Sequence, residues 1–218
     1  MEKIKAFIRS LTPRRMVVYV VGLFFLACGI TMNTKTHLGV SPVLSVAYNI
    51  TQLTGIDFSL MTFIYYLFLI ALQFLLDRAH FEQVQWLQLA VSFLTSAFIG
   101  LFDRVLPEAQ GPVWQIVMLL LAVVLTAIGI ILTIGARFVP NPADGLAAAI
   151  GRRMGKSLGL GKNVLDLASI ALALLLGLVF TGGILGVGLG TVITMLLTGR
   201  VVALLQKPLL RLSGLDRE

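Results

Sequence analysis

The chain has 218 residues, of which 58% are hydrophobic and only 12% are charged, and its mean hydropathy is +0.97. Soluble domains carry roughly 25% charged residues, so this composition excludes a soluble protein and predicts one membrane domain over residues 1–218. The net charge of +7 is attributed to membrane topology and not to nucleic-acid binding, because basic residues concentrate in the cytoplasmic loops of membrane proteins.

Six apolar runs approach the roughly 20 residues that a helix needs to cross a bilayer. In chain order these predicted spans are Met16–Thr34, Phe58–Leu76, Trp86–Phe102, Val113–Ile134, Val164–Phe180 and Ile184–Leu205. If both termini are cytoplasmic, only Lys35 and Arg104 of the 17 Lys and Arg residues fall outside. This asymmetry predicts a multi-pass protein with its N- and C-termini in the cytoplasm.

Two segments between these spans are apolar but contain a proline. Ser41-Pro42 and Asn141-Pro142 lie 100 residues apart, and each pair follows the first span of its half. Proline suits the first turn of a helix, and Ser and Asn are good N-cap residues. Each pair therefore predicts the start of a helix too short to span. A rival count lets these helices span and gives eight crossings; charge does not separate the two counts, and segment length favours six.

The repetition extends beyond the prolines, since Gly29, Ile30, Ala47 and Ile50 also recur 100 residues later. Each half, roughly residues 16–103 and 113–205, then holds three spans. An odd number of spans makes the second half enter the membrane from the opposite side. We therefore predict an all-α membrane protein of six transmembrane helices in two inverted three-helix repeats, each with a short half-helix after its first span. Interrupted helices in corresponding places of two halves are typical of transporters.

Small residues at four-residue spacing predict close packing between membrane helices. Such residues are Ser92, Ser96 and Gly100 in the third span and Gly182, Gly186, Gly190, Thr194 and Thr198 in the last. We expect the third and last spans to cross near the symmetry axis. The alternative is that these faces form a homodimer interface.

A half-helix that starts inside the membrane exposes unpaired N–H groups and the positive end of its dipole. Ser41-Pro42 and Asn141-Pro142 therefore predict two sides of one solute site. Further polar groups for this site are Asn49 and a polar face of the third span that consists of Gln88, Ser92, Thr95 and Ser96. That face either binds solute or bonds to a neighbouring helix.

Asp144 follows Asn141-Pro142-Ala143 and is the strongest single candidate. An ionisable group at membrane depth indicates a functional site by default, and a carboxylate there favours a cationic or amine-bearing solute or carries a coupling proton. The alternative is an acid that offsets the dipole of the first turn. Asp166 is a second candidate for proton coupling, although Lys162 four residues earlier is placed for a local ion pair.

Signatures of enzymes are absent from the sequence, which contains neither a His-Glu-x-x-His helix, a Gly-x-Ser-x-Gly elbow nor a Walker loop. Two histidines and one cysteine do not suggest a metal cluster. We expect neither catalysis nor a metal or cofactor site.

Four stretches of the chain match a known family: Gly22–Ile30, Leu38–Pro42, Pro142–Leu146 and Gly182–Thr191. Through them the chain resembles the YczE/YyaS/YitT family of bacterial membrane proteins. The resemblance implies a bacterial plasma-membrane protein, and it brings no assigned substrate and no established site residues. The Asn141-Pro142-Ala143 tripeptide also resembles aquaporins, but Asp144 stands where those channels have an arginine, so a water channel is rejected.

Together these features predict a secondary transporter of a small polar solute across the bacterial plasma membrane. Its expected partners are the solute and membrane lipid, and no nucleic acid. Two alternatives remain open: a substrate-capture membrane subunit of a vitamin-type uptake system, and a non-transporting scaffold that assembles through its glycine-rich faces.

Overall fold

The computed structural model describes residues 12–215, and most of these residues are helical. The α-helices are α2 (Pro13–Thr34), α3 (Ser45–Thr54), α4 (Phe58–Leu76), α5 (Gln88–Val105), α6 (Pro112–Gly135), α7 (Pro142–Arg153), α8 (Leu158–Thr181) and α9 (Leu189–Ser213). Two short 3-10 helices, η1 (Arg78–His80) and η2 (Gln83–Leu87), join α4 to α5. Within the described part, six helices are long and apolar enough to cross a membrane, which confirms the predicted number of spans.

Two further helices are too short to span. Helix α3 has 10 residues and α7 has 12, about 15 and 18 Å of helix against roughly 30 Å of hydrocarbon. Their lengths favour six crossings over eight. Helix α7 begins at Pro142 as predicted, and the Asn141 side chain caps it by accepting a hydrogen bond from Ala143 N at 3.1 Å.

The first break differs from the prediction, because Pro42 does not begin α3 and Ser41 does not cap it. Residues 42–44 form a turn, and the helix begins at Ser45 with Leu44 as its N-cap. Ser45 N donates to the Ser41 carbonyl at 3.0 Å, and the Ser45 hydroxyl donates to the Pro42 carbonyl at 2.6 Å. These two bonds close a tight turn that delays the helix by three residues.

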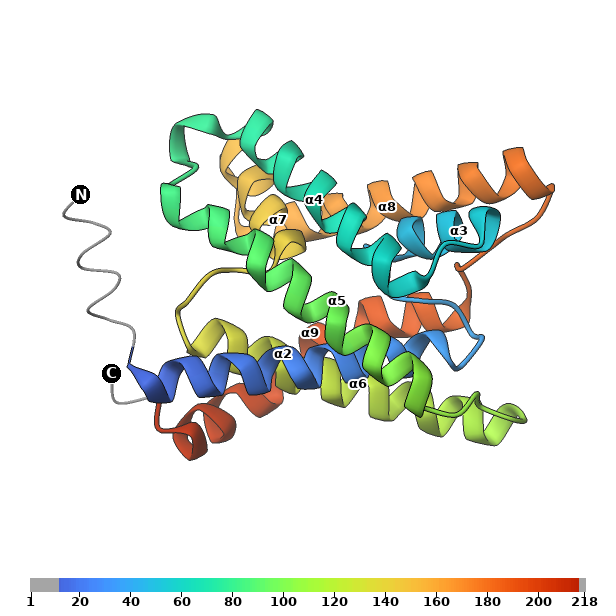
Figure 1. Ribbon diagram of the computed structural model, residues 1–218, viewed down its shortest axis with the longest axis horizontal. Helices are drawn as coiled ribbons and strands as arrows, with labels where there is room; N and C mark the ends of the chain where they lie inside the picture. Colours follow the sequence, from blue (N-terminus) through green and yellow to red (C-terminus); the bar gives the residue numbers. More distant parts are fainter. Residues whose placement is uncertain (1–11, 216–218) are drawn as a thin grey trace.

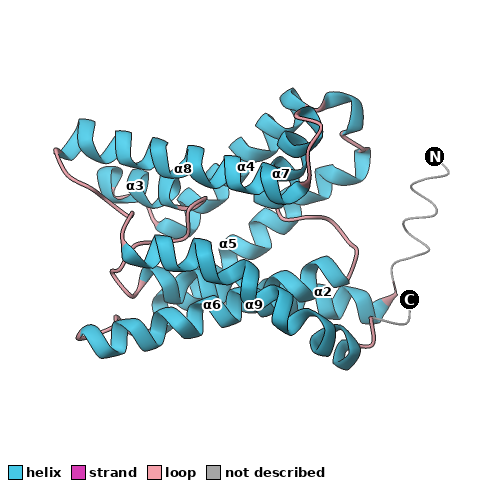
Figure 2. Cartoon of the chain, turned by 180° about the vertical axis from the view of Figure 1, so that it is seen from behind, coloured by secondary structure: helices cyan, strands magenta, loops and turns pink. Residues whose placement is uncertain are grey.

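The helices form two layers, with α3, α4, α7 and α8 in one and α2, α6 and α9 in the other (Figure 2), while α5 packs on both α2 and α4. Helices α2 and α6 lie side by side and run in opposite directions (Figure 1). The start of α2 and the end of α9 lie at the end of the molecule that carries α7, and α3 lies toward the opposite end (Figure 1).

The α2–α6 contact is close because glycines stand where side chains would collide. A Cβ added to Gly29 would lie 2.6 Å from Thr126 N, and one added to Gly129 would lie 2.5 Å from Leu26 N. Position 129 is position 29 plus 100, and position 126 is position 26 plus 100. The two helices therefore contact each other through equivalent positions. Small residues permit such backbone approach where lipid supplies no hydrophobic drive between helices.

The predicted crossing of the third and last spans is therefore wrong, and the central crossing belongs to α2 and α6. Gly100 of α5 faces Ser59 of α4, and Gly190 of α9 faces the Leu38–Gly39 backbone. Gly182 ends α8 in the left-handed conformation typical of a helix C-terminus, with φ of 69°, and Gly186, with φ of 66°, lies in the loop before α9. The last span consequently begins at Leu189 and not at Ile184.

Ion clusters join the loops at both ends of the bundle. At the α3 end, Lys35 Nζ lies 2.9 Å from Asp103 and 2.7 Å from Glu108. Burial opposes the charge of Lys35, but hydrogen bonds and attraction from Glu108 and Asp103 outweigh it and raise the pKa of this lysine. At the α7 end, Asp77 lies 2.6 Å from both His80 and Arg152. Burial opposes the charge of Asp77, but hydrogen bonds from His80 and Arg152 prevail and lower its pKa.

Replacing Gly129 by leucine should prevent the folding of the monomer, because the Leu26 backbone occupies the space that the new side chain needs. Size-exclusion chromatography and thermal unfolding in detergent measure the loss. Gly199→Leu is the matched control, since nothing lies within 4 Å of a Cβ added at Gly199. Equal behaviour of the two variants would contradict the close α2–α6 crossing.

Asp77→Asn should destabilise the protein by about 1–2 kcal/mol at pH 7, because it removes the charge that His80 and Arg152 bind. Since the folded-state pKa lies below the ordinary value of 3.8, the ionised group stabilises the fold above that value. This contribution is lost as pH falls through the lower folded pKa. Thermal unfolding of both proteins between pH 7 and pH 3 should show the difference shrinking with acid. Asp57→Asn, at an exposed position, should change little at either pH.

Candidate functional site

The start of α7 is held against α4 by buried polar contacts. Asn141 is 7% exposed, and its side chain also hydrogen-bonds to Tyr66 of α4, which is itself buried. Its carbonyl accepts from Gly145 N at 2.8 Å. Pro142 is buried beside it. The cap and the tyrosine fix the first turn of α7 in the interior of one layer.

A charged cluster adjoins this turn. Asp144 Oδ1 lies 3.6 Å from Lys162 Nζ on α8, and Lys162 is within electrostatic reach of Asp166 as well. The predicted ion pair between Lys162 and Asp166 is not the contact formed: Lys162 pairs with Asp144, because the first turn of α7 packs on α8. Asp166 is 6% exposed. Two carboxylates thus share one lysine, which leaves a net charge of about −1 when all three are ionised.

A buried polar face runs along the α4–α5 hairpin. It comprises Thr62 and Gln73 of α4 and Gln88, Ser92, Thr95 and Ser96 of α5, each at most 6% exposed. The hydroxyls of Ser92 and Thr95 donate to carbonyls one turn earlier, Gln88 O at 2.7 Å and Val91 O at 2.8 Å. Within the described residues, Thr62 Oγ1, Gln73 Oε1, Ser96 Oγ and both amide atoms of Gln88 have no hydrogen-bond partner.

The residues of the first break lie in a different environment. Val40 N donates to the Gly186 carbonyl at 2.9 Å, and Gly190 N donates to the Leu38 carbonyl at 2.7 Å. Asn49 Nδ2 donates to the Leu185 carbonyl at 2.8 Å, while its Oδ1 is buried without a partner. Ser41 N donates to the Asn33 side-chain oxygen at 3.2 Å in the amide orientation that also lets the Asn33 side-chain nitrogen donate to the Gly39 carbonyl at 2.9 Å. The first break is therefore joined to the loop that precedes α9.

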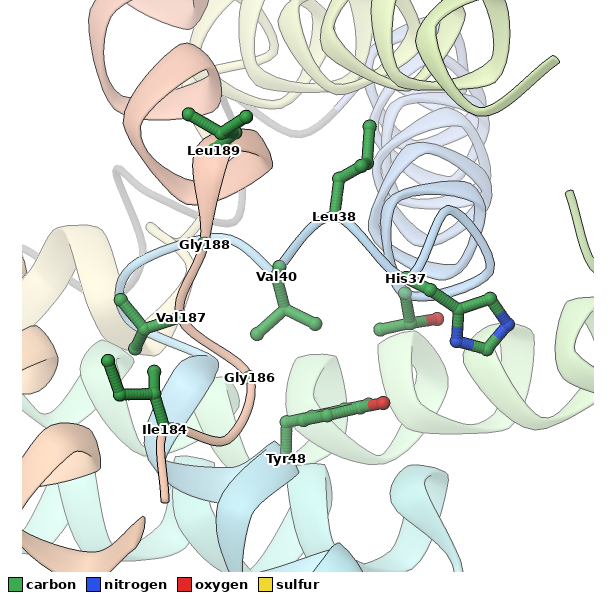
Figure 3. A pocket seen from close by; sticks show the side chains of 11 residues that line it. His37, Leu38, Val40, Tyr48, Ile184, Gly186, Val187, Gly188 and Leu189 are labelled. Atoms are coloured by element: carbon green, nitrogen blue, oxygen red, sulfur yellow. The ribbon is translucent and has the colours of Figure 1, made fainter. Parts of the chain in front are cut away.

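A hollow of about 330 Å³ lies at this junction (Figure 3). Its lining includes His37, Tyr48 and the backbone of Gly186 and Gly188, and the rings of His37 and Tyr48 border the open space. Sequence reasoning did not point to this hollow. The feature of the sequence that indicates it is the run of closely spaced glycines before α9; four-residue spacing predicts a helix face there, but the structure has a loop.

The predicted site residues therefore fall into two groups. Asn141, Pro142 and Asp144 lie at the start of α7, with Asp166 near Lys162 on α8. Asn49 contacts the loop before α9, and Ser41-Pro42 directly follows Val40, which contacts the same loop. Both short helices also contribute to one apolar cluster, α3 through Leu44 and Ala47 and α7 through Leu146 and Ala147. Over residues 12–215, no three His, Cys, Asp or Glu side chains gather closely enough to hold a metal ion.

Gln73 is the residue that sequence reasoning missed at the α7 end. It lies within an uninterrupted apolar run of α4, where a single amide is the available signal. Polar side chains inside a membrane span are expensive and point to the bundle interior. Gln88 belonged to the predicted polar face, but its proximity to α7 was not predictable from spacing along one helix.

Comparison with known proteins agrees with these features. The chain is 26% identical over 189 residues to the uncharacterized membrane protein YczE of Bacillus subtilis (strain 168), and the match covers 86% of this chain and 83% of that protein. No solved structure matches. These findings confirm the resemblance to YczE-like membrane proteins. Since the model of the family of unknown function DUF6198 matches residues 13–207, the chain belongs to that family.

Proposed function

We propose that this membrane protein is a secondary transporter of a small polar solute that carries an amine or another cationic group. The observation that carries the proposal is a pair of carboxylates that share Lys162 of α8: Asp144 at the start of the short helix α7 and Asp166 on α8. Ionisable residues at membrane depth mark substrate or ion pathways by default. Asp144 then binds the cationic group, and Asp166 carries a coupling proton.

Two inverted repeats, roughly residues 16–103 and 113–205 of one membrane domain, form part of this proposal. Among the described residues, the non-glycine residues with positive φ are His37 and Arg137, 100 positions apart. Helix α3 packs on α8, and α7 correspondingly packs on α4. The equivalent helices run in opposite directions: α2 opposite to α6, α4 opposite to α8, and α5 opposite to α9 (Figure 1). Transporters built in this way bind solute at the repeat interface.

The distribution of basic residues supports cytoplasmic termini in a bacterial plasma membrane. Arg78 lies in η1, Arg152 and Arg153 end α7, and Lys156 follows in the loop to α8, all at the α7 end, whereas Lys35 follows α2 at the α3 end. Positive residues concentrate on the cytoplasmic side, so α7 is assigned to that side. The site around Asp144 then faces the cytoplasmic half of the membrane. The remaining parts of the proposal are that the protein is not an enzyme and that its partners are solute and lipid.

The electrostatics favour a cation over an anion. With Lys162 between them, the two carboxylates leave a net negative charge, which the positive end of the α7 dipole offsets only in part. A positively charged solute or a proton lowers the cost of this charge in a medium of low polarity. Uptake of an anion would instead add a second uncompensated negative charge.

Asp144→Asn should lower solute exchange about tenfold or more, a loss of ~1.4 kcal/mol of binding or greater, because it removes charge at nearly constant shape. Counterflow of the amine that most stabilises the purified protein, measured in liposomes, checks this. Asp57→Asn, at the opposite end of the bundle, is the control and should exchange normally. Unchanged exchange would reduce Asp144 to a residue that offsets the helix dipole. If the wild-type protein alone exchanges no amine, a capture subunit or a scaffold replaces the transporter proposal.

A further inference from the structure

Two buried glutamines face the first turn of α7 from the α4–α5 hairpin. Gln73 is 1% exposed near the end of α4, and Gln88 is fully buried at the start of α5. A Cβ added to Gly145 would lie 2.6 Å from Gln73 Oε1 and 3.1 Å from Gln88 Nε2. Both amides therefore reach the same place, beside the residue that follows Asp144.

These amides are short of hydrogen bonds. Gln73 Nε2 donates to Gln85 Oε1 at 3.4 Å, but Gln73 Oε1 and both amide atoms of Gln88 have no partner among the described residues. Buried polar groups in native proteins are nearly always bonded to protein, water or ligand, and exceptions call for an explanation. The penalty for an unbonded group is largest in an apolar interior. Gln73 Oε1 is a free acceptor and Gln88 Nε2 a free donor beside the same point, so together they can bind the N–H and C=O groups of an amide.

We infer that Gln73 and Gln88 form the second half of the solute site and bind a neutral group that both donates and accepts hydrogen bonds. This inference rests on the proposed function, in which Asp144 binds the cationic end of the solute. Gln88 Nε2 donates to a carbonyl of the solute, and Gln73 Oε1 accepts from its N–H group. The substrate class is thus a small amine that also carries a carboxamide or a similar group.

Gly145 is part of the same arrangement. A side chain at this position would press on the end of the Gln73 side chain, which is flexible and moves at small cost. Glycine at position 145 consequently leaves room for the amide beside the backbone of α7. Gly145→Ala is expected to fold normally while it displaces the amide.

The first test needs no solute. Gln88→Leu replaces an unbonded amide with an apolar side chain of similar size, so it should raise the apparent Tm of the purified protein by about 2–4 °C. Gln83→Leu, at an exposed position in η2, is the matched control and should leave Tm nearly unchanged. A glutamine that holds the fold together would behave in the opposite way, and a lower Tm for Gln88→Leu would overturn the inference.

The second test compares two probes, glycinamide and ethylamine, by thermal shift at pH 7 with the full-length protein in detergent. Glycinamide carries an amine and a carboxamide, whereas ethylamine carries the amine alone. The wild-type protein should be stabilised more by glycinamide. Three variants should lower the apparent affinity for glycinamide at least tenfold and leave the response to ethylamine unchanged: Gln88→Leu, Gln73→Leu and Gly145→Ala.

The outcomes separate this inference from the transport proposal. One outcome would leave the cation site standing and overturn the amide site. In that outcome ethylamine stabilises the wild-type protein, Asp144→Asn abolishes this stabilisation, and glycinamide stabilises no more than ethylamine does. An excess for glycinamide that persists in Gln88→Leu and Gln73→Leu also overturns the inference. So does a wild-type protein that responds to neither probe.

Discussion

The close approach of α2 and α6 organises this molecule. Helices in a membrane gain no hydrophobic free energy by leaving lipid for one another, so their association depends on packing at short range. Gly29 and Gly129 permit that packing by bringing each backbone against the other helix. Helix α5 then packs on α2 and α9 on α6. A bulky residue at this crossing would separate the pair on which the other helices are assembled.

The two breaks in the chain lead from this pair to the second layer. At His37 and Arg137 the backbone enters the left-handed region, with φ of 56° and 50°, which is unusual for residues with a side chain. After each break a short helix packs against a span distant in the sequence, α3 against α8 and α7 against α4. Irregular backbone at membrane depth is tolerated where protein surrounds it or a cavity adjoins it. Both conditions occur here, the first at α7 and the second at the hollow beside Tyr48.

Polar groups in the bundle serve two different purposes. The ion clusters around Lys35 and Asp77 lie at the helix ends, where the charges hold loops together and water compensates them in part. Beside the start of α7, Gln73 Oε1 and both amide atoms of Gln88 are buried without a hydrogen-bond partner among the described residues. Such groups lower stability unless a bound molecule satisfies them. The same residues are therefore expected to weaken the empty protein and to create affinity for solute.

Local features of the sequence determined the helices. Hydropathy and length predicted six spans, and the Asn141-Pro142 pair predicted both the start of α7 and its cap, because a cap is made by residues adjacent in the chain. The same reasoning misplaced the start of α3, since the side chain of Ser45 closes a turn after Pro42. It also extended the last span over Gly186, because a positive φ is not visible in a glycine-rich run.

Only the tertiary structure decided which residues meet. Small residues indicate that some helix approaches closely but do not say which one, so the α2–α6 crossing was not predicted. Lys162 has a carboxylate four residues away on its own helix, yet its partner is Asp144 of α7. Gln73 and Gln88 converge on Gly145 from separate helices. Which side chains come into contact depends on their distance in space, and the packing of all the helices determines that distance. Spacing along one helix determines only which side chains share a face.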